Sequence, residues 1–256
     1  MKISVCVDAL WPHLSCEAAI VKAAENGAEA VEFWSWWDKD LSAVKAACKK
    51  NGVKVAALCT RFFSLVDQSQ HEAYLRGLDE TIQVADMLSC HTIISQVGNE
   101  QTGMSREEQR RNLVEGLDKS TLLLSGHDIQ LVIEPLNTQI DHKGYYLYSS
   151  CEAAQIVQEV SSPQVKMLFD IYHQQVMEGD ILRHIRQHFP HIGHMHCAGV
   201  PGRGPLAKSE LDYDYIFGAI EKMGYKEYMG LELFTGTPEM EIQKWCSRTI
   251  VTGHKA

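Results

Sequence analysis

The segment IQLVIEPLN, residues 129–137, is an apolar run that ends in an acid and a proline. Three later segments have the same character, namely KMLFDIYH (166–173), IGHMHCAG (192–199) and YMGLELF (228–234). Each has the length and composition of a buried β-strand, and each ends near a side chain of a type that binds metal ions, in order Glu134, Asp170, His196 and Glu232. Four such residues in successive units predict a divalent metal site.

The same unit, a short apolar run followed by a longer amphipathic stretch, extends over the whole chain with a period of about thirty residues. The runs with strand character cover residues 3–9, 30–34, 54–60, 92–97, 129–135, 166–171, 192–198 and 228–234. The stretches with helical character cover residues 15–26, 40–51, 70–88, 105–125, 149–160, 179–188, 213–223 and 238–251. Several of these stretches begin with a serine or aspartate that can cap a helix.

These eight strand-then-helix units predict an α/β fold, a single (β/α)8 TIM barrel that forms one domain over residues 1–256. No long linker or low-complexity segment separates the units, and the strands are hydrophobic almost throughout, as in a parallel sheet buried on both faces. An open doubly wound sheet is the structural alternative. In a barrel, the carboxyl ends of the strands share one rim, so the four candidate ligands should meet there.

Composition limits the classes of function. The 256 residues are 45% hydrophobic, which is enough for one substantial core, and the net charge of -9 provides no basic surface for nucleic acid. We therefore expect a small-molecule substrate. The eight cysteines form no CxxC pair, and the chain shows neither a signal peptide nor an apolar stretch long enough for a membrane span, so we expect a cytoplasmic protein with no membrane partner. The oligomeric state stays open, with a homo-oligomer among the options.

Three carboxylates buried at strand ends need either a shared cation or basic partners. We expect the basic residues to be poor partners, because Lys166 starts its strand on the opposite rim while Lys143 and Arg203 lie in loops. The three carboxylates and one imidazole form a ligand set that favours Mg²⁺ or Mn²⁺ and also suits Co²⁺ or Zn²⁺. For any one of these residues alone, a surface salt bridge or a helix cap is an equal explanation.

Two further residues are candidates for substrate binding. His173 follows Asp170 by three residues, and it either belongs to a simple turn or donates to a substrate oxygen. Arg203 lies in the loop GVPGRGP, where a guanidinium suits a carboxylate or a polyhydroxylated substrate but is also common on a solvated surface. His194 and His196 alternate on one strand and so face the same side, and we favour His196 as the ligand because it is closer to the rim.

The first half of the chain is expected to contribute no metal ligand. Its four strands are predicted to end on Ala9, Trp34, Thr60 and Val97. We expect at least one of the tryptophans at positions 34, 36 and 37 to line the pocket, although packing beneath a helix explains them equally well. No nucleophile elbow, dinucleotide-binding glycine motif or P-loop is present, and no lysine ends a strand, which argues against a Schiff-base aldolase.

The second half resembles the hydroxypyruvate isomerase family, within the xylose-isomerase-like TIM barrels. The matching segments are IEPLNTQIDHKGYYL, LFDIYHQQ, HCAGVPGR and GYKEYMGLELF, and AAENGAEAVEFW agrees in the first half. The resemblance implies a metal-dependent isomerase or epimerase in which Glu134 and Glu232 are both metal ligands and catalytic acid/base groups. The chain departs from the family pattern at His196, where many of these isomerases have glutamine and ketose 3-epimerases have histidine, and at Gly204-Pro205, where Glu-Pro is usual.

The expected function is a divalent-metal-dependent isomerase that interconverts an α-hydroxy aldehyde and a ketone-type partner by proton transfer through an enediolate. Hydroxypyruvate and tartronate semialdehyde, or a related small sugar acid, are the expected substrates. One alternative is a ketose 3-epimerase similar to tagatose 3-epimerase and acting on a free sugar. More remote are a zinc phosphodiesterase or endonuclease of the same superfamily, which uses more histidines and acids on more strands, and a non-catalytic sugar-binding barrel.

Overall fold

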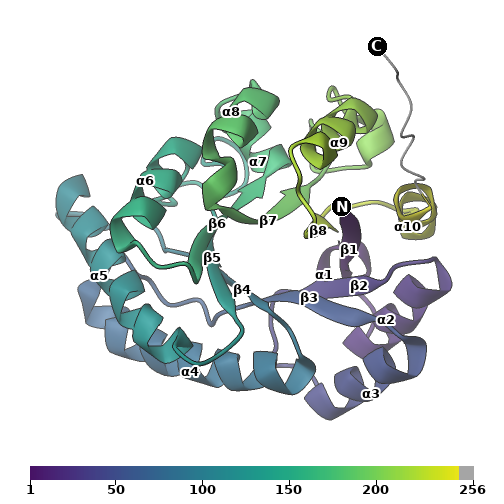
Figure 1. Cartoon of the computed structure of the whole chain (residues 1–256), viewed down its shortest axis with the longest axis horizontal. Helices are drawn as coiled ribbons and strands as arrows, with labels where there is room; N and C mark the ends of the chain where they lie inside the picture. The colour runs from purple at the N-terminus through teal and green to yellow at the C-terminus, as the bar shows by residue number, and fades with distance from the viewer. Residues whose placement is uncertain (248–256) are drawn as a thin grey trace.

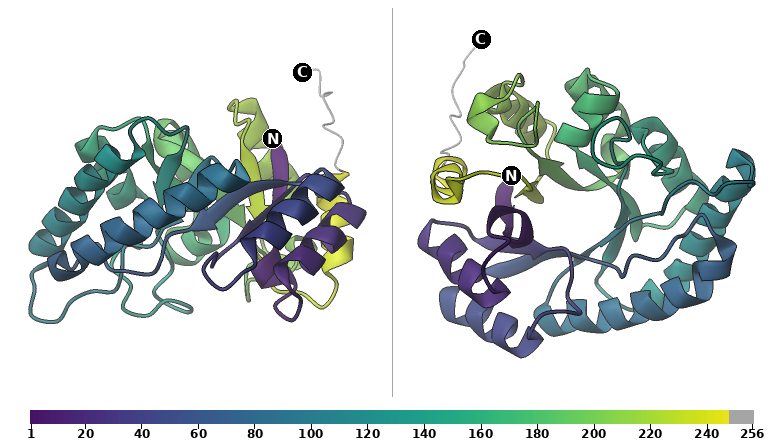
Figure 2. Two further views of the ribbon diagram at one scale, coloured as in Figure 1. Left: turned by 90° about the horizontal axis from the view of Figure 1, so that it is seen from below. Right: turned by 180° about the vertical axis from the view of Figure 1, so that it is seen from behind.

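A computed structural model of the chain describes residues 1–247, and its strands form one closed parallel barrel in the order β1 to β8 (Figure 1). This confirms the predicted (β/α)8 barrel and excludes the open sheet. β1 pairs with both β2 and β8, which closes the barrel, and all views show the N-terminus beside this junction (Figure 2). The strands span Lys2–Cys6, Ala30–Phe33, Lys54–Cys59, Thr92–Ser95, Gln130–Ile133, Val165–Asp170, Ile192–Cys197 and Tyr228–Leu231.

Helices surround the barrel and cover the outer faces of the strands (Figure 1). The α-helices α1 to α10 span Val7–Leu10, Cys16–Glu25, Leu41–Asn51, His71–Leu88, Arg106–Leu124, Ser150–Val160, Ile171–Met177, Ile181–His188, Tyr213–Lys222 and Pro238–Cys246. Short 3₁₀ helices lie at Gln68–Gln70, Phe189–His191 and Leu206–Lys208. The predicted end of the last helix, at residue 251, lies outside the described residues.

Side-chain caps explain why several helices begin where the sequence predicts. The Asp40 carboxylate accepts hydrogen bonds from the backbone N–H groups of Ser42 and Ala43, each at 3.0 Å, at the start of α3. Ser105 accepts from the N–H of Glu108 at 3.1 Å at the start of α5. These contacts satisfy N–H groups that have no partner inside the helix, so they fix the helix start locally.

Two helices were not predicted. The strand expected over residues 3–9 ends at Cys6, and the chain turns into the short helix α1. Helix α7 begins directly after β6, because Asp170 is also its N-cap and accepts from the N–H groups of Tyr172 at 2.7 Å and His173 at 3.3 Å. The apolar pattern continues across both boundaries, so periodicity alone did not reveal where strand becomes helix.

Side chains on the strands alternate between the helix layer and the barrel interior. On β5, Leu131 and Ile133 belong to the large core between strands and helices, whereas Val132 belongs to a smaller cluster. Glu134 lies two residues beyond Val132 and therefore shares its inward direction, as Asp170 does on β6. The smaller cluster fills the interior beside β3 to β6 and consists of Ala57, Cys59, Ile94, Val132 and Leu168.

The interior beside the other four strands is polar. It contains Ser4 on β1, Glu32 on β2, and His194 and His196 on β7, all of them buried. Gly230 on β8 makes room for these side chains, because a Cβ there would lie 2.6 Å from His196 Cδ2 and 2.8 Å from Glu32 Oε1. One half of the barrel interior is therefore apolar. The other half contains buried polar side chains, and they fit because β8 has a glycine at position 230.

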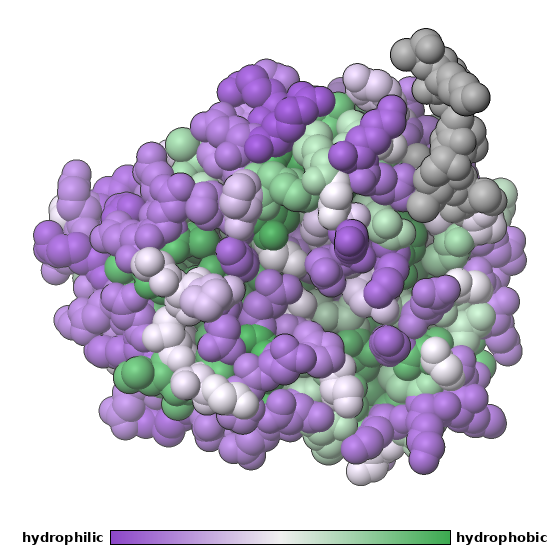
Figure 3. Space-filling view, in the orientation of Figure 1, coloured by the Kyte–Doolittle hydropathy of each residue, from purple (hydrophilic) through white to green (hydrophobic). Residues whose placement is uncertain are grey.

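None of the helices in residues 1–247 is both long and apolar enough to cross a bilayer. The face drawn in Figure 3 is largely hydrophilic, with hydrophobic residues scattered among the polar ones. This matches helices that bury one side against the barrel and expose the other.

The substitution Gly230→Ala should lower the free energy of unfolding by about 1–3 kcal/mol, because the new methyl group overlaps the His196 ring and the Glu32 carboxylate. Urea unfolding followed by circular dichroism measures this change. Gly236→Ala is the matched control, since no atom of the described residues lies within 4 Å of a Cβ at that position; its effect should stay within about 0.5 kcal/mol. Equal stability of the two variants would contradict the packing argument.

Candidate metal centre

The four residues predicted as metal ligands lie together inside one rim of the barrel. Glu134 directly follows β5, Glu232 directly follows β8, Asp170 ends β6, and His196 lies one residue before the end of β7. One potential ligand atom from each of the four lies within 4.8 Å of the others, and all four residues are buried. The four side chains, which come from different strands, are therefore close enough together to bind one ion.

Unpaired polar atoms test whether this group fits a cation. Among the described residues, Glu134 Oε1, Asp170 Oδ2 and His196 Nδ1 are buried and have no hydrogen-bond partner. His196 Nδ1 lies 3.3 Å from Glu232 Oε2 and 3.9 Å from Glu134 Oε1. Buried polar atoms without partners are costly, and a divalent cation bound by these oxygens and this nitrogen would remove that cost. The residues present therefore fit a metal ion.

The protonation of the three buried carboxylates also favours a bound cation. Burial, together with the charge of Glu232, raises the pKa of Glu134 to about 8, and burial also raises the pKa of Asp170. Burial alone would raise the pKa of Glu232 too, but Arg203 and His196 outweigh it and lower that pKa well below its usual value. A divalent cation would add the positive charge that keeps all three carboxylates ionised.

Arg203 lies against this group, which corrects one expectation. Its guanidinium donates a hydrogen bond to Glu232 Oε2, so a loop residue does pair with a strand-end carboxylate. The loop folds back because the N–H of Gly199 donates to the carbonyl of Gly204 at 2.7 Å. The N–H of Phe234 also donates to the carbonyl of Arg203 at 2.8 Å, which ties the loop to the residues after β8.

His173 is fully buried beside the four candidate ligands, and its hydrogen bonds identify its tautomer. The Asn137 side-chain oxygen accepts from the N–H groups of Ile140 and Asp141 at 3.1 and 3.0 Å, which orients the Asn137 amide. Asn137 then directs its side-chain NH₂ at 2.7 Å and its backbone N–H at 3.2 Å to His173 Nδ1. Burial lowers the pKa of His173 well below its usual value, so the neutral ring carries its proton on Nε2, which lies 3.6 Å from Asp170 Oδ2.

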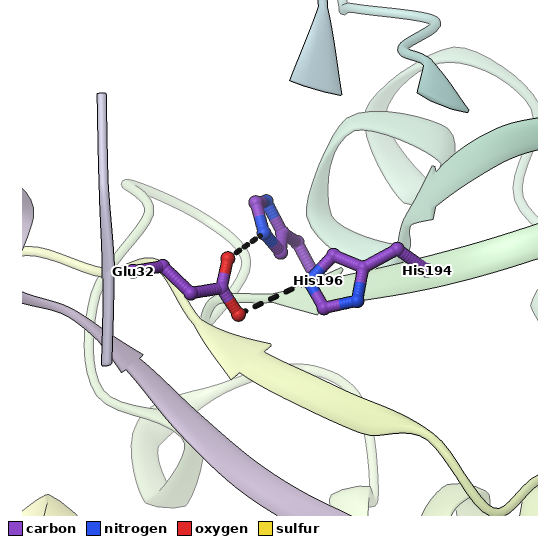
Figure 4. A group of neighbouring side chains, drawn as sticks. All are labelled: Glu32, His194 and His196. Atoms are coloured by element: carbon purple, nitrogen blue, oxygen red, sulfur yellow. Dashed lines mark hydrogen bonds and ion pairs between the residues drawn. The ribbon is translucent and has the colours of Figure 1, made fainter. Parts of the chain in front are cut away.

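Glu32 is the residue that sequence reasoning missed (Figure 4). Its Oε1 lies 3.0 Å from His194 Nε2 and also accepts from the Ser4 hydroxyl, and its Oε2 lies 2.8 Å from His196 Nε2. A glutamate inside the otherwise apolar strand AVEF was an available signal. The prediction considered only residues at strand ends, and Glu32 lies before the end of its strand. The observed ends of the first four strands, Cys6, Phe33, Cys59 and Ser95, replace the predicted Ala9, Trp34, Thr60 and Val97.

The three tryptophans after β2 differ in their roles. The indole N–H of Trp34 donates to Glu232 Oε1, so this ring lies beside the four candidate ligands. Trp36 donates to Thr81 at 3.1 Å instead, and Trp37 packs edge-on against Phe62 with ring centroids 5.2 Å apart. Trp34 is therefore the one of these three tryptophans that borders the candidate metal centre.

Comparison with known proteins agrees with this architecture. The sequence model of the xylose isomerase-like TIM barrel family matches residues 20–247. Hydroxypyruvate isomerase of Escherichia coli (strain K12) is 30% identical over 241 residues, which cover 91% of this chain and 93% of that protein. 2-Oxo-tetronate isomerase of Cupriavidus necator is 28% identical over 218 residues, which cover 82% of this chain and 84% of that protein.

Among solved structures, the protein described as AP endonuclease, family 2, from Brucella melitensis superposes with a TM-score of 0.90 and 24% identity. The match covers 95% of this chain and 97% of the Brucella protein, and at this identity it supports the fold alone. The sequence relatives decide the family. The chain is an isomerase that belongs to the hydroxypyruvate isomerase family of the xylose isomerase-like TIM barrels.

Proposed function

We propose that this protein is a divalent-metal-dependent isomerase that interconverts an α-hydroxy aldehyde and a ketone-type partner. The proposed substrate pair is hydroxypyruvate and tartronate semialdehyde, or a related small sugar acid. The convergence of Glu134, Asp170, His196 and Glu232 within 4.8 Å is the observation that carries the proposal. Similarity to hydroxypyruvate isomerase and 2-oxo-tetronate isomerase supports a small sugar acid as substrate.

The same four residues would hold the metal ion. Three carboxylates and one imidazole favour Mg²⁺ or Mn²⁺, and the imidazole also suits Co²⁺ or Zn²⁺. When bound, the cation supplies Lewis-acid stabilisation of the negative charge that develops on the substrate oxygens. The protein contributes the rigid positions of the ligands, because all four lie on or directly after strands of a closed barrel.

Proton transfer is assigned to Glu134 and Glu232. A carbon-bound proton next to a carbonyl group leaves only when a base is in contact with it and the resulting enediolate is stabilised. The two carboxylates come from β5 and β8, so they approach the centre from different sides of the barrel. In the proposed reaction, one carboxylate removes the proton from carbon, and the same or the opposite carboxylate returns a proton to the neighbouring carbon. The hydroxyl proton of the substrate passes from one of the two substrate oxygens to the other, so the reaction is balanced without a further reactant.

His173 and Arg203 would orient the substrate. Asn137 holds the His173 proton on Nε2, which has no partner among the described residues and is therefore available to donate to a substrate oxygen. The buried Nε–H of Arg203 has no partner in the part of the chain that the structure describes, while another of its nitrogens contacts Glu232. A guanidinium at this place suits the carboxylate of a sugar acid.

A ketose 3-epimerase remains a second candidate, and His196 is the observation that favours it. An epimerase would use the same two carboxylates but would return the proton to the opposite face of one carbon. A zinc phosphodiesterase fits less well, because the central group contains three carboxylates and only one imidazole.

The substrate class can be tested by incubating the Mn²⁺-loaded protein in deuterated water with hydroxypyruvate, a 2-oxo-tetronate or a free ketose. We expect conversion of a sugar acid with deuterium incorporated at the carbon that receives the proton, because acid/base groups exchange with solvent. Mass spectrometry and NMR locate the label, and excess chelator should abolish turnover. Inversion of a free ketose at C3 without isomerisation of any sugar acid would favour the epimerase, and no turnover of any substrate would refute both.

Replacing either proposed proton carrier should stop catalysis. Glu134→Gln and Glu232→Gln should each lower kcat by about 10²–10⁴-fold, since an amide can neither remove nor deliver the proton. Steady-state kinetics at saturating Mn²⁺ measure the loss. Glu227→Gln is the control, because Glu227 is exposed just before the start of β8 on the opposite rim. Full activity in either of the first two variants would rule out the mechanism.

Arg203→Ala should discriminate between charged and neutral substrates. For an anionic substrate, loss of the charge-assisted contact should raise KM by about 10- to 100-fold. Because Arg203 also contacts Glu232, kcat should fall as well, so the comparison depends on KM for a sugar acid against KM for a ketose. Arg203→Lys keeps the charge and should recover part of the loss. An unchanged KM for the sugar acid would remove Arg203 from substrate binding.

A further inference from the structure

Glu32 is buried in the barrel interior, and it contacts a candidate ligand without belonging to the central group. Only 2% of its surface is exposed, and both carboxylate oxygens accept hydrogen bonds (Figure 4). Glu32, His194 and His196 also form a second group whose atoms lie close enough to hold an ion. Two roles are therefore conceivable for Glu32, namely a ligand of a second ion or a support for His196.

The imidazole of His196 decides between these roles, because it is the member that the two groups share. A neutral imidazole has one protonated nitrogen and one nitrogen with a free lone pair. Nε2 lies 2.8 Å from Glu32 Oε2, while Nδ1 faces Glu232 and Glu134 at 3.3 and 3.9 Å and has no hydrogen-bond partner in residues 1–247. A proton on Nε2 satisfies Glu32 and leaves the Nδ1 lone pair directed at the central group. Two ions would require both nitrogens to lose their protons.

We propose that Glu32 is a positioning residue, which holds the proton of His196 on Nε2 and fixes the ring so that Nδ1 binds the catalytic cation. The inference rests on the metal-dependent function proposed above and extends it to a residue on the far side of the barrel. A carboxylate that accepts from the second nitrogen of a metal-binding histidine sets its tautomer and strengthens it as a ligand.

The surrounding strands are built to hold Glu32 in place. β2 and β7 are not neighbours in the barrel, since β8 and β1 lie between them, so Glu32 must reach across the interior to His196. Ser4 and Gly230, which pair with each other on these intervening strands, are both small. Ser4 donates to Glu32 Oε1, and Gly230 leaves the space that a Cβ would take.

His194 completes the arrangement by occupying Oε1 at 3.0 Å, which leaves Oε2 for His196. The two imidazole rings meet edge to face, with centroids 5.0 Å apart. The Glu32 carboxylate is thus held by donors from β1 and β7 and cannot turn away from His196 without breaking them. This rigidity is what a support for a metal ligand requires.

The test is the affinity of the full-length protein for Mn²⁺ alone, measured by calorimetry or by the loss of the free Mn²⁺ signal in electron paramagnetic resonance. We expect one ion per chain in the unsubstituted protein and about 10- to 100-fold weaker binding in Glu32→Gln. Glu241→Gln is the matched control, because Glu241 is also a buried glutamate, but its Oε2 accepts a hydrogen bond from the indole N–H of Trp245 at 3.1 Å within α10. Its Mn²⁺ affinity should be unchanged.

A double-mutant cycle separates positioning from a general loss of structure. If Glu32 acts through the His196 ring, then adding Glu32→Gln to a His196→Gln protein should change Mn²⁺ affinity by less than about 3-fold. The same 10- to 100-fold loss in that background would overturn the proposal, as would unchanged affinity in Glu32→Gln alone. Two bound ions per chain would also overturn it.

If Glu32→Gln fails to fold, NMR of the unsubstituted protein can determine which nitrogen of His196 carries the proton. With ¹⁵N-labelled histidine and Zn²⁺ as a diamagnetic probe, His196 should show a proton on Nε2 and a metal-shifted Nδ1. The opposite tautomer would refute the role of Glu32. Failure of the unsubstituted protein to bind any divalent ion would instead refute the metal dependence of the proposed function, so the two failures can be told apart.

Discussion

The need of buried carboxylates for shared positive charge is the constraint on which the centre of this barrel depends. Glu134, Asp170 and Glu232 are all buried, and each has a potential ligand atom within 4.8 Å of those of the others. Arg203 contacts Glu232, but an oxygen of Glu134 and one of Asp170 have no hydrogen-bond partner within residues 1–247. A divalent cation bound by all three acids would supply positive charge to each of them directly, whereas the hydrogen bond of Arg203 goes to Glu232.

Closure of the barrel brings these strand-end residues together in one site. Parallel strands direct their carboxyl ends to a common rim, and the alternation along each strand selects which residues face inward. The apolar half of the interior, beside β3 to β6, provides a packed floor, while the half beside β1, β2, β7 and β8 connects Glu32 to His196. The candidate metal centre therefore extends below the rim, and part of its support comes from Ser4 on β1 and Glu32 on β2, two strands that contribute no ligand to the central group.

In the proposed mechanism, residues at strand ends transfer protons, and residues held by loops contact the substrate. The proposed proton carriers, Glu134 and Glu232, directly follow rigid strands. The proposed substrate contacts are set by less regular segments, since Asn137 fixes the proton of His173 and a backbone hydrogen bond to Phe234 holds the loop of Arg203. Such an arrangement keeps the proton-transfer geometry constant while leaving substrate preference to residues that can change without disturbing the barrel.

The sequence by itself determined the (β/α)8 fold, the strand starts and most helix boundaries to within two residues, and the four residues that converge, because strand alternation, helix caps and strand-end position are local patterns. The predicted strands all ran past their observed ends. It did not reveal helices α1 and α7, where apolar character continues across a change of backbone conformation. Only the tertiary structure placed Arg203 on Glu232 and Glu32 against His196. Those contacts join residues 29 and 164 positions apart, and they form only once a loop has folded back and a closed barrel has brought β2 opposite β7 across the space at Gly230.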